Sequence, residues 1–442
     1  MNQNAFVHSN LVHGIRANLD QFLHQLLQVM LVGFTIGMMR TVIPALAESE
    51  FAVPKNSFML LTTFVVAFGF VKGTLNFVAG RLSERIGRKK VLLLGWIAAL
   101  PIPLLIYFAP SWYWIVAATA LLGINQGLTW SMTQTAKLDM TRSDQRGLTI
   151  GLNEFSGYVG LALAGIATAY LATVLGARTG LLIFGLTTIL LAILLTLLWV
   201  KDTLPWAKLE AAKHTTAPST GVITRYPTNI SAQPTTWEVF TLMSWRDKRL
   251  AAICQAGLVE KFVDALVWVL YPVFLYQRGL SLPDIGWIVG VYGFVWGGSQ
   301  FFTGKLSDHI GRHKPNVWGM WICGAGVAMM LWNEGAVWWS FSAAVSGFGM
   351  ALLYPNLSAA VADISHPNWR GSAIGIYRFW RDLDYGIGAL GLGIAAHFSG
   401  TVEAAFWFVV ISMGLSGLLL LIWGEETHPN QACIEYCGLP KI

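Results

Sequence analysis

The stretch GRLSERIGRKK at residues 80–90 recurs as GKLSDHIGRHK at residues 304–314. The register that aligns Gly80 with Gly304, called the repeat register below, also aligns other landmarks of the two halves: Asp139 with Asp363, Arg146-Gly147 with Arg370-Gly371, Ile150-Gly151 with Ile374-Gly375, and Phe155 with Phe379. Chance does not keep one register without a net gap over so many landmarks. The chain therefore contains an internal repeat, and its halves are expected to share one topology.

The composition is typical of a membrane protein. Of the 442 residues, 55% are hydrophobic and 12% are charged, whereas a soluble domain carries about 25% charged residues. These values exclude a soluble enzyme and a disordered chain, and no catalytic site or cofactor is expected. We attribute the net charge of +6 to basic loops rather than to a nucleic-acid partner. Cys433 and Cys437 supply only two thiols, so no metal site is expected.

Long apolar runs predict an all-α membrane protein with twelve transmembrane helices, because about 20 apolar residues cross a bilayer as a helix. The first six runs lie near 23–46, 57–80, 91–109, 112–137, 148–172 and 179–200. The second six lie near 249–276, 284–304, 316–333, 336–362, 371–397 and 402–423. The predicted parts are a tail 1–22, a six-helix bundle 23–200, a polar linker 201–247, a second bundle 248–423 and a tail 424–442.

The distribution of basic residues predicts the orientation in the membrane. Of the 29 Lys and Arg residues, 21 lie in segments on the side of the termini and three lie in the opposite loops. Cytoplasmic loops carry this excess of positive charge. Both termini are therefore expected in the cytoplasm, with the chain as a monomer in the plasma (inner) membrane.

The repeated motif G-x-L-S-[DE]-x-x-G-R-x-K follows the second and the eighth predicted helix and resembles the signature of the major facilitator superfamily. With twelve spans and a polar middle loop, the resemblance covers essentially the whole chain. It implies two six-helix bundles around a central cavity that opens alternately to the two sides of the membrane. It also implies that helices 1, 4, 7 and 10 line the cavity and that helices 2, 5, 8 and 11 lie between the halves.

The two signature loops supply candidate site residues: Gly80, Glu84, Gly87 and Arg88 in the first copy, and Gly304, Asp308, Gly311 and Arg312 in the second. The resemblance implies that the first acid faces the start of helix 11 and that Arg88 contacts Asp139. Glu84, Arg88 and Asp139 would then form a cytoplasmic latch that favours the outward-open state. The second copy is expected to contribute less, because that half lacks the helix 11 contact. The alternative is that both loops set only orientation and turn geometry.

Charged residues inside the predicted spans are candidates for substrate binding or ion coupling, because a charge in the bilayer is costly. The repeat register aligns Asp264 of helix 7 with Arg40 of helix 1, and these two are expected to pair. Glu260 and Lys261 fall on the same helical face as Asp264. The alternative is that these pairs merely neutralise one another.

A second group of charges lies nearer the cytoplasm. Lys72 of helix 2 is expected to reach Asp382 of helix 11, where Arg378, Arg381, Asp382 and Tyr385 share a face and Asp384 points elsewhere. Glu154 of helix 5 aligns with Arg378 through the repeat and is a candidate proton carrier. The alternative is a salt-bridge network that only holds the halves together.

These features predict a secondary transporter that moves a small polar or charged solute, driven by protons or by the solute's own gradient. An efflux pump for amphipathic compounds is the alternative within transport. Two departures count against the drug–proton antiporters: Gly123 replaces the Arg of their helix 4 motif, and Gly157-Tyr158-Val159-Gly160 lacks their Pro. Metal transport through scattered His and Met side chains is a weaker alternative. A transport-inactive receptor or assembly subunit is the alternative of another class.

Overall fold

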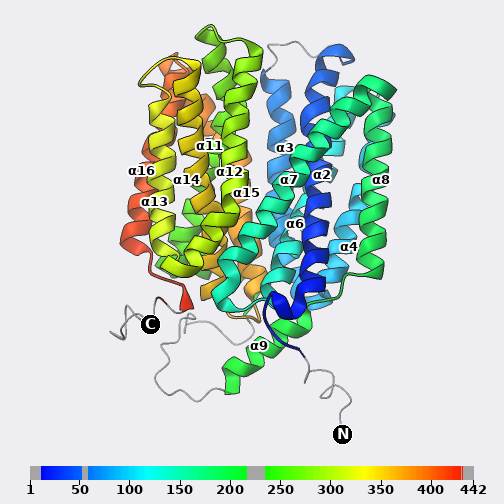
Figure 1. The fold of residues 1–442 in the computed structure, drawn as a ribbon, viewed down its shortest axis with the longest axis vertical. Helices are drawn as coiled ribbons and strands as arrows, with labels where there is room; N and C mark the ends of the chain where they lie inside the picture. The colour runs from blue at the N-terminus through cyan, green and yellow to red at the C-terminus, as the bar shows by residue number, and fades with distance from the viewer. Residues whose placement is uncertain (1–10, 52–57, 217–233, 430, 432–442) are drawn as a thin grey trace. The chain divides into compact units, whose positions relative to one another are not determined.

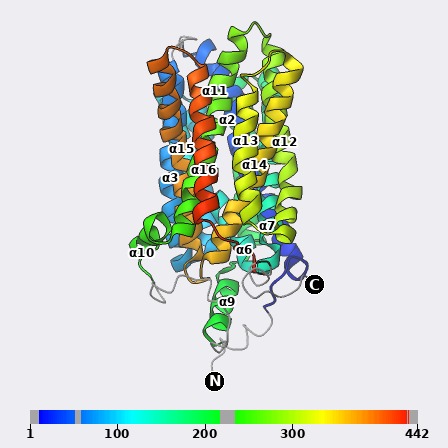
Figure 2. The ribbon, with the colours of Figure 1, turned by 90° about the vertical axis from the view of Figure 1, so that its left-hand side faces the viewer.

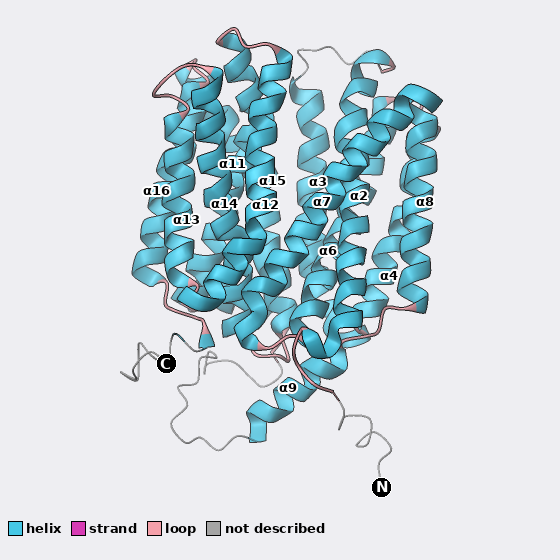
Figure 3. Cartoon of the chain, in the orientation of Figure 1, coloured by secondary structure: helices cyan, strands magenta, loops and turns pink. Residues whose placement is uncertain are grey.

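The computed structural model describes residues 11–51, 58–216, 234–429 and 431. In this part of the chain every regular element is helical (Figure 3). Helices suit a bilayer because each backbone N–H and C=O is satisfied within its own segment. The predicted all-α fold with twelve membrane helices is confirmed.

The first half of the chain provides the helices α2 (Leu19–Ser49), α3 (Phe58–Ile86), α4 (Arg88–Ala99), α5 (Pro101–Tyr107), α6 (Trp112–Met140), α7 (Arg146–Leu175) and α8 (Ala177–Leu198). The elements α4 and α5 form the third predicted span, which Pro101 interrupts. A proline is tolerated at the first position of a helix because that N–H has no partner within the helix.

The stretch predicted as a linker contains the helices α9 (Leu204–Thr216) and α10 (Thr236–Thr241). The second half provides α11 (Lys248–Gln277), α12 (Leu282–Ile310), α13 (His313–Met329), α14 (Ala336–Ile364), α15 (Arg370–Ser399) and α16 (Glu403–Trp423) (Figures 1 and 2). Asp247 caps α11 by accepting hydrogen bonds from the backbone N–H groups of Arg249 and Leu250.

The helices form two compact units. Unit 1 comprises 1–142, 153–239 and 365–379, and unit 2 comprises 143–152, 240–364 and 380–442. The units differ from the two predicted bundles mainly in two segments. The first turns of α7 belong to unit 2, and the first turns of α15 belong to unit 1.

Equivalent helices lie at the centre of each unit. In unit 1, α6 packs against α2, α3, α4 and α5, and in unit 2, α14 packs against α11, α12 and α13. The C-terminal halves of both central helices are buried on all sides. They are the fourth and tenth membrane helices, so the repeat places the same element in the same structural role.

Six spans of the described part are apolar enough to cross a membrane by length and hydropathy alone: α2, α4 with α5, α7, α8, α14 and α16. Among the others, α3, α6, α11 and α15 contain buried charged side chains. These charged side chains lower the mean hydropathy of the four helices. Because they are buried in protein, they are not exposed to lipid.

Glycines allow close approach of the helices that carry the signature motif. A Cβ at Gly304 of α12 would overlap the carbonyl oxygen of Gly147 at the start of α7. A Cβ at Gly80 of α3 would overlap the carbonyl oxygen of Gly371 at the start of α15. Gly87 and Gly311 have φ angles of 97° and 96°, which favour glycine at these turns.

We predict that Gly304→Ala destabilises the protein, because neither backbone can yield to the added methyl group. Overpacking of this kind costs about 1–3 kcal/mol. The control is Gly298→Ala on the same helix, where a Cβ meets no atom within 4 Å. The measurement is the melting temperature of both purified variants in detergent. An equal melting temperature for the two variants would contradict the close approach.

Candidate functional site

A buried ion pair anchors the first signature loop. Arg88 Nε lies 2.8 Å from Asp139 Oδ2 at the C-terminal end of α6. The Arg88 guanidinium also donates to the backbone carbonyl of Ser83 at 2.8 Å, and the Thr203 hydroxyl donates to Asp139 Oδ2 at 3.0 Å. Arg88 is 2% exposed and Asp139 is fully buried, so the pair lies in protein rather than at a solvated surface.

Glu84 of the same loop caps α15. Its Oε1 accepts a hydrogen bond from the backbone N–H of Ser372 at 2.6 Å, and its Oε2 accepts one from the Ser372 hydroxyl at 2.9 Å. A carboxylate is favourable here because the N-terminus of a helix carries partial positive charge. Glu84 lies outside the predicted spans; burial raises its pKa, and the hydrogen bonds from Ser372 oppose this rise.

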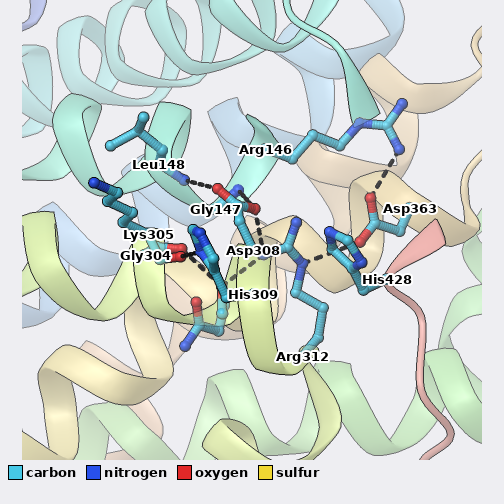
Figure 4. A network of polar contacts seen from close by, with 12 residues as sticks. Arg146, Gly147, Leu148, Gly304, Lys305, Asp308, His309, Arg312, Asp363 and His428 are labelled. Atoms are coloured by element: carbon cyan, nitrogen blue, oxygen red, sulfur yellow. Dashed lines mark hydrogen bonds and ion pairs between the residues drawn. The ribbon is translucent and has the colours of Figure 1, made fainter. Parts of the chain in front are cut away.

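The second signature loop makes the equivalent contacts in unit 2 (Figure 4). Asp308 accepts hydrogen bonds from the backbone N–H groups of Gly147 at 2.9 Å and Leu148 at 2.8 Å, at the start of α7. Arg312 Nε lies 3.2 Å from Asp363 Oδ2. The two copies therefore make matching contacts, and the weaker contribution of the second copy to closure stays a prediction.

The ends of the central helices also bind the arginines that begin the neighbouring helices. Arg146 of α7 donates to Asp363 Oδ1 at 2.9 Å (Figure 4). Its repeat partner Arg370 of α15 acts electrostatically on Asp139. Arg370 also makes a two-pronged ion pair with Glu210 of α9, at 2.7 and 2.8 Å. Sequence reasoning missed Glu210, because the polar composition of the linker did not indicate a structural contact.

Two further acids hold the signature loops and were missed from the sequence. Asp202 accepts a hydrogen bond from the backbone N–H of Arg88 at 3.2 Å. Glu426 accepts hydrogen bonds from the backbone N–H groups of Arg312 at 2.8 Å and His313 at 3.2 Å. The repeat register also aligns Asp202 with Glu426. Extending the repeat past the sixth and twelfth helices would have found them.

Unit 1 surrounds Glu154 with polar partners that the sequence could not name. The indole N–H of Trp130 and the Asn153 amide each donate to Glu154 Oε1 at 2.9 Å. Lys137 of α6 interacts electrostatically with Glu154. Arg378 donates to the Gln134 side chain at 2.7 Å.

Unit 2 contains a buried ion pair inside an aromatic box. Lys261 Nζ lies 3.1 Å from Asp264 Oδ2 within α11, and both residues are buried. The same ammonium lies 4.8 Å from the ring centroids of Trp296 and Tyr354 and 5.7 Å from that of Tyr385. Aromatic faces attract cations electrostatically, so the box holds the Lys261 ammonium in one place.

The remaining charges of unit 2 gather on α11 and α15. Arg381 Nε lies 3.2 Å from Asp382 Oδ1. Glu260 and Asp384 are also fully buried. Asp384 was placed on another face of its helix, yet it interacts electrostatically with Lys261, Asp264 and Glu260.

Two predicted pairings are not tested by these contacts. The side chain of Arg40 lies outside the described residues, so its pairing with Asp264 stays a prediction. Lys72 belongs to unit 1 and Asp382 to unit 2, so their pairing also stays a prediction. Within unit 1, the Lys72 ammonium lies 5.4 Å from the ring centroid of Phe68 and 6.0 Å from that of Trp130.

Comparison with known proteins places the chain in a family. The model of the Major Facilitator Superfamily matches residues 26–260 and 253–432. An uncharacterised MFS-type transporter of Salmonella typhimurium is 24% identical over 312 residues, 70% of this chain and 70% of that protein. A probable 4-methylmuconolactone transporter of Cupriavidus pinatubonensis is 24% identical over 352 residues, 78% of this chain and 77% of that protein. Citrate exporter 1 of Aspergillus niger is 27% identical over 187 residues, 41% of this chain and 35% of that protein.

Solved structures share the fold at low sequence identity. The human organic anion transporter MFSD10 has a TM-score of 0.74 and 17% identity, over 91% of this chain and 99% of that one. The proton:xylose symporter XylE has a TM-score of 0.72 and 14% identity, over 92% of this chain and 96% of that one. With the family model covering both halves, the chain belongs to the major facilitator superfamily and is an integral membrane transporter of small-molecule solutes rather than an enzyme.

Proposed function

We propose that the chain is a secondary transporter that moves a small polar or charged solute by alternating access, coupled to protons. The observation that carries this proposal is the set of fully buried ionisable side chains on the membrane helices, above all Glu260, Lys261 and Asp264 of α11. Ionisable groups at membrane depth are costly and mark solute or proton pathways. Their position on the seventh helix matches a cavity-lining helix of the superfamily.

Among charged solutes we favour small organic anions. Two proteins similar to this chain are named as a citrate exporter and an organic anion transporter. The buried Arg378 of unit 1 supplies a cationic group of the kind that a carboxylate solute needs. The orientation with both termini in the cytoplasm of the plasma (inner) membrane is part of the same proposal.

We further infer that the signature loops act as cytoplasmic latches. Glu84 caps the first turn of α15, a helix that continues from unit 1 into unit 2. Asp308 caps the first turn of α7, which continues from unit 2 into unit 1. Each acid therefore holds a helix that both units share. Releasing such a cap favours the conformation in which the cytoplasmic side is open.

The transport proposal predicts coupled movement of protons and an organic anion. Proteoliposomes containing the protein and a trapped pH-sensitive dye are given a pH gradient, and citrate is added as the first probe of a carboxylate panel. We expect a carboxylate to change the lumenal pH and the labelled carboxylate to cross the membrane. Protein-free liposomes are the control. A response only to tetraphenylphosphonium would favour amphipathic efflux, and solute binding without any flux would favour a receptor.

The latch proposal predicts that Glu84→Gln opens the cytoplasmic side. A hydrogen bond to a charged group contributes about 1.5–3 kcal/mol, which corresponds to about a ten- to hundredfold population shift. Spin labels at the exposed positions Arg85→Cys and His309→Cys report the separation of the two loops by pulsed electron resonance. We expect a longer-distance population in Glu84→Gln and the wild-type distribution in Glu425→Gln, an exposed acid. Identical distributions in both variants would leave the loop as a topological anchor only.

The Arg88–Asp139 pair predicts a strong effect on stability. Arg88→Met leaves Asp139 as a buried charge, and breaking a buried pair costs about 3–5 kcal/mol. Adding Asp139→Leu removes the orphaned charge, so the double variant is expected to regain part of the melting temperature. Arg85→Met, at a neighbouring exposed arginine, is the control and should have little effect. A double variant less stable than Arg88→Met would contradict the pairing.

A further inference from the structure

Two carboxyl groups of unit 2 lack the hydrogen bonds that a buried charge requires. Glu260 of α11 and Asp384 of α15 are both fully buried. Among the residues that the structure describes, no donor reaches any of their four carboxyl oxygens. An ionised carboxylate removed from water is strongly unfavourable unless it is paired and hydrogen-bonded.

Other buried acids of the described chain have hydrogen-bond donors for their carboxyl oxygens. Asp139 accepts hydrogen bonds from Arg88 and Thr203. Asp363 accepts hydrogen bonds from Arg146 and Arg312. Glu154 accepts hydrogen bonds from the Trp130 indole and the Asn153 amide. Each of these three buried carboxyl groups therefore has at least one oxygen with a donor, whereas Glu260 and Asp384 have none among the described residues.

The nearest cations are engaged elsewhere. The Lys261 ammonium lies 3.1 Å from Asp264 Oδ2, which also accepts a hydrogen bond from the Tyr385 hydroxyl at 3.3 Å. Arg381 lies against Asp382 and 4.5 Å from the ring centroid of Tyr354. Both cations act on Glu260, but by attraction through space rather than through hydrogen bonds.

A buried tyrosine hydroxyl interacts with acids of the same region. Tyr292 of α12 is 3% exposed, and its hydroxyl has no hydrogen-bond partner among the described residues. It interacts electrostatically with Asp264 and Glu260. The Tyr292 hydroxyl is therefore another buried polar group of this region without a hydrogen-bond partner among the described residues.

The titratable and charged groups that act on Glu260 and Asp384 come from α11, α12, α13 and α15. They are Lys261 and Asp264 on α11, Tyr292 on α12, Cys323 on α13, and Arg381 and Asp382 on α15. The two acids also repel one another when both are ionised. Neutralising each with a proton removes both the repulsion and the cost of burial.

We propose that Glu260 and Asp384 are the proton-binding pair of this transporter, beside the Lys261–Asp264 ion pair. This inference rests on the proposed proton coupling and names its site. Proton binding forms one O–H bond on each carboxyl group, and release on the other side of the membrane breaks it. No electron transfer or co-reactant is involved.

The surroundings favour protons over other cations. An organic ammonium would need the aromatic faces of Trp296, Tyr354 and Tyr385, which the Lys261 ammonium already occupies. In the described part of the chain, no three His, Cys, Asp or Glu side chains gather closely enough to hold a metal ion. A proton needs only one carboxyl oxygen.

The test is infrared spectroscopy of the full-length protein in lipid, because the C=O stretch of a protonated carboxyl group is distinct from the carboxylate bands. At neutral pH we expect such a band in the wild type. Glu260→Gln and Asp384→Asn should each remove part of it. The controls are Glu154→Gln, a buried acid with donors, and Glu403→Gln, an exposed acid; both should leave the band unchanged. A band unchanged in Glu260→Gln and Asp384→Asn would overturn the proposal.

Two further measurements test whether the acids are ionised and whether the site binds another cation. Both amide variants mimic the protonated side chain, so their melting temperatures at neutral pH should be at least that of the wild type. A clear loss of stability in both would show that the acids are ionised and overturn the proposal. Sodium or choline chloride should not change the wild-type band, and loss of the band on adding either would identify a cation site instead.

Failure of the proposed function gives a different result. If liposomes move a solute without moving protons while the protonated band persists, the coupling is wrong. If protons move and Glu260→Gln and Asp384→Asn keep wild-type proton flux, the coupling stands and the assignment of the pair is wrong.

Discussion

A charged side chain inside a bilayer must find its partner within the protein, because hydrocarbon offers neither water nor counter-ions. This constraint accounts for the arrangement of most polar groups described above. Lys261 is paired with Asp264 and Arg381 with Asp382, all four of them buried. Where donors are lacking, as at Glu260, neutralisation by a proton is the remaining solution. The same physical requirement therefore leads to fixed ion pairs at some sites and to proton binding at another.

The repeat preserves buried ion pairs in both halves. In each half, the acid of the signature loop caps the first turn of a helix, and the arginine of the loop pairs with an acid at the end of the central helix. A further acid from outside the loop accepts a hydrogen bond from the backbone N–H of that arginine. The acids Asp202 and Glu426 extend this symmetry beyond the motif itself. Such matching contacts suit an element with the same task in both halves, which we propose is to close the cytoplasmic side.

The charged cluster of α11 and α15 does not follow the repeat. In the repeat register, Glu260, Lys261 and Asp384 correspond to Ile36, Gly37 and Gly160. The first half therefore has the loops without these charges. Proton binding, as proposed, is a property of one half, whereas conformational closure is shared by both.

The sequence by itself determined the twelve helices, the repeat and the loop residues, because hydropathy, charge distribution and register are local properties of the chain. It also indicated Arg88 and Asp139 through the family resemblance. Only the tertiary structure decided which carboxyl groups have donors. Asp384 was assigned to a separate face because a helical wheel assumes one buried side, yet the chain around 381–385 is buried on most sides. Glu154 accepts hydrogen bonds from Trp130 and Asn153, and Arg370 forms an ion pair with Glu210. These contacts depend on how the segments pack, and hydrophobic periodicity in the sequence does not predict them. Hydrogen-bond satisfaction depends on distances of a few tenths of an ångström between side chains, and these are set by packing.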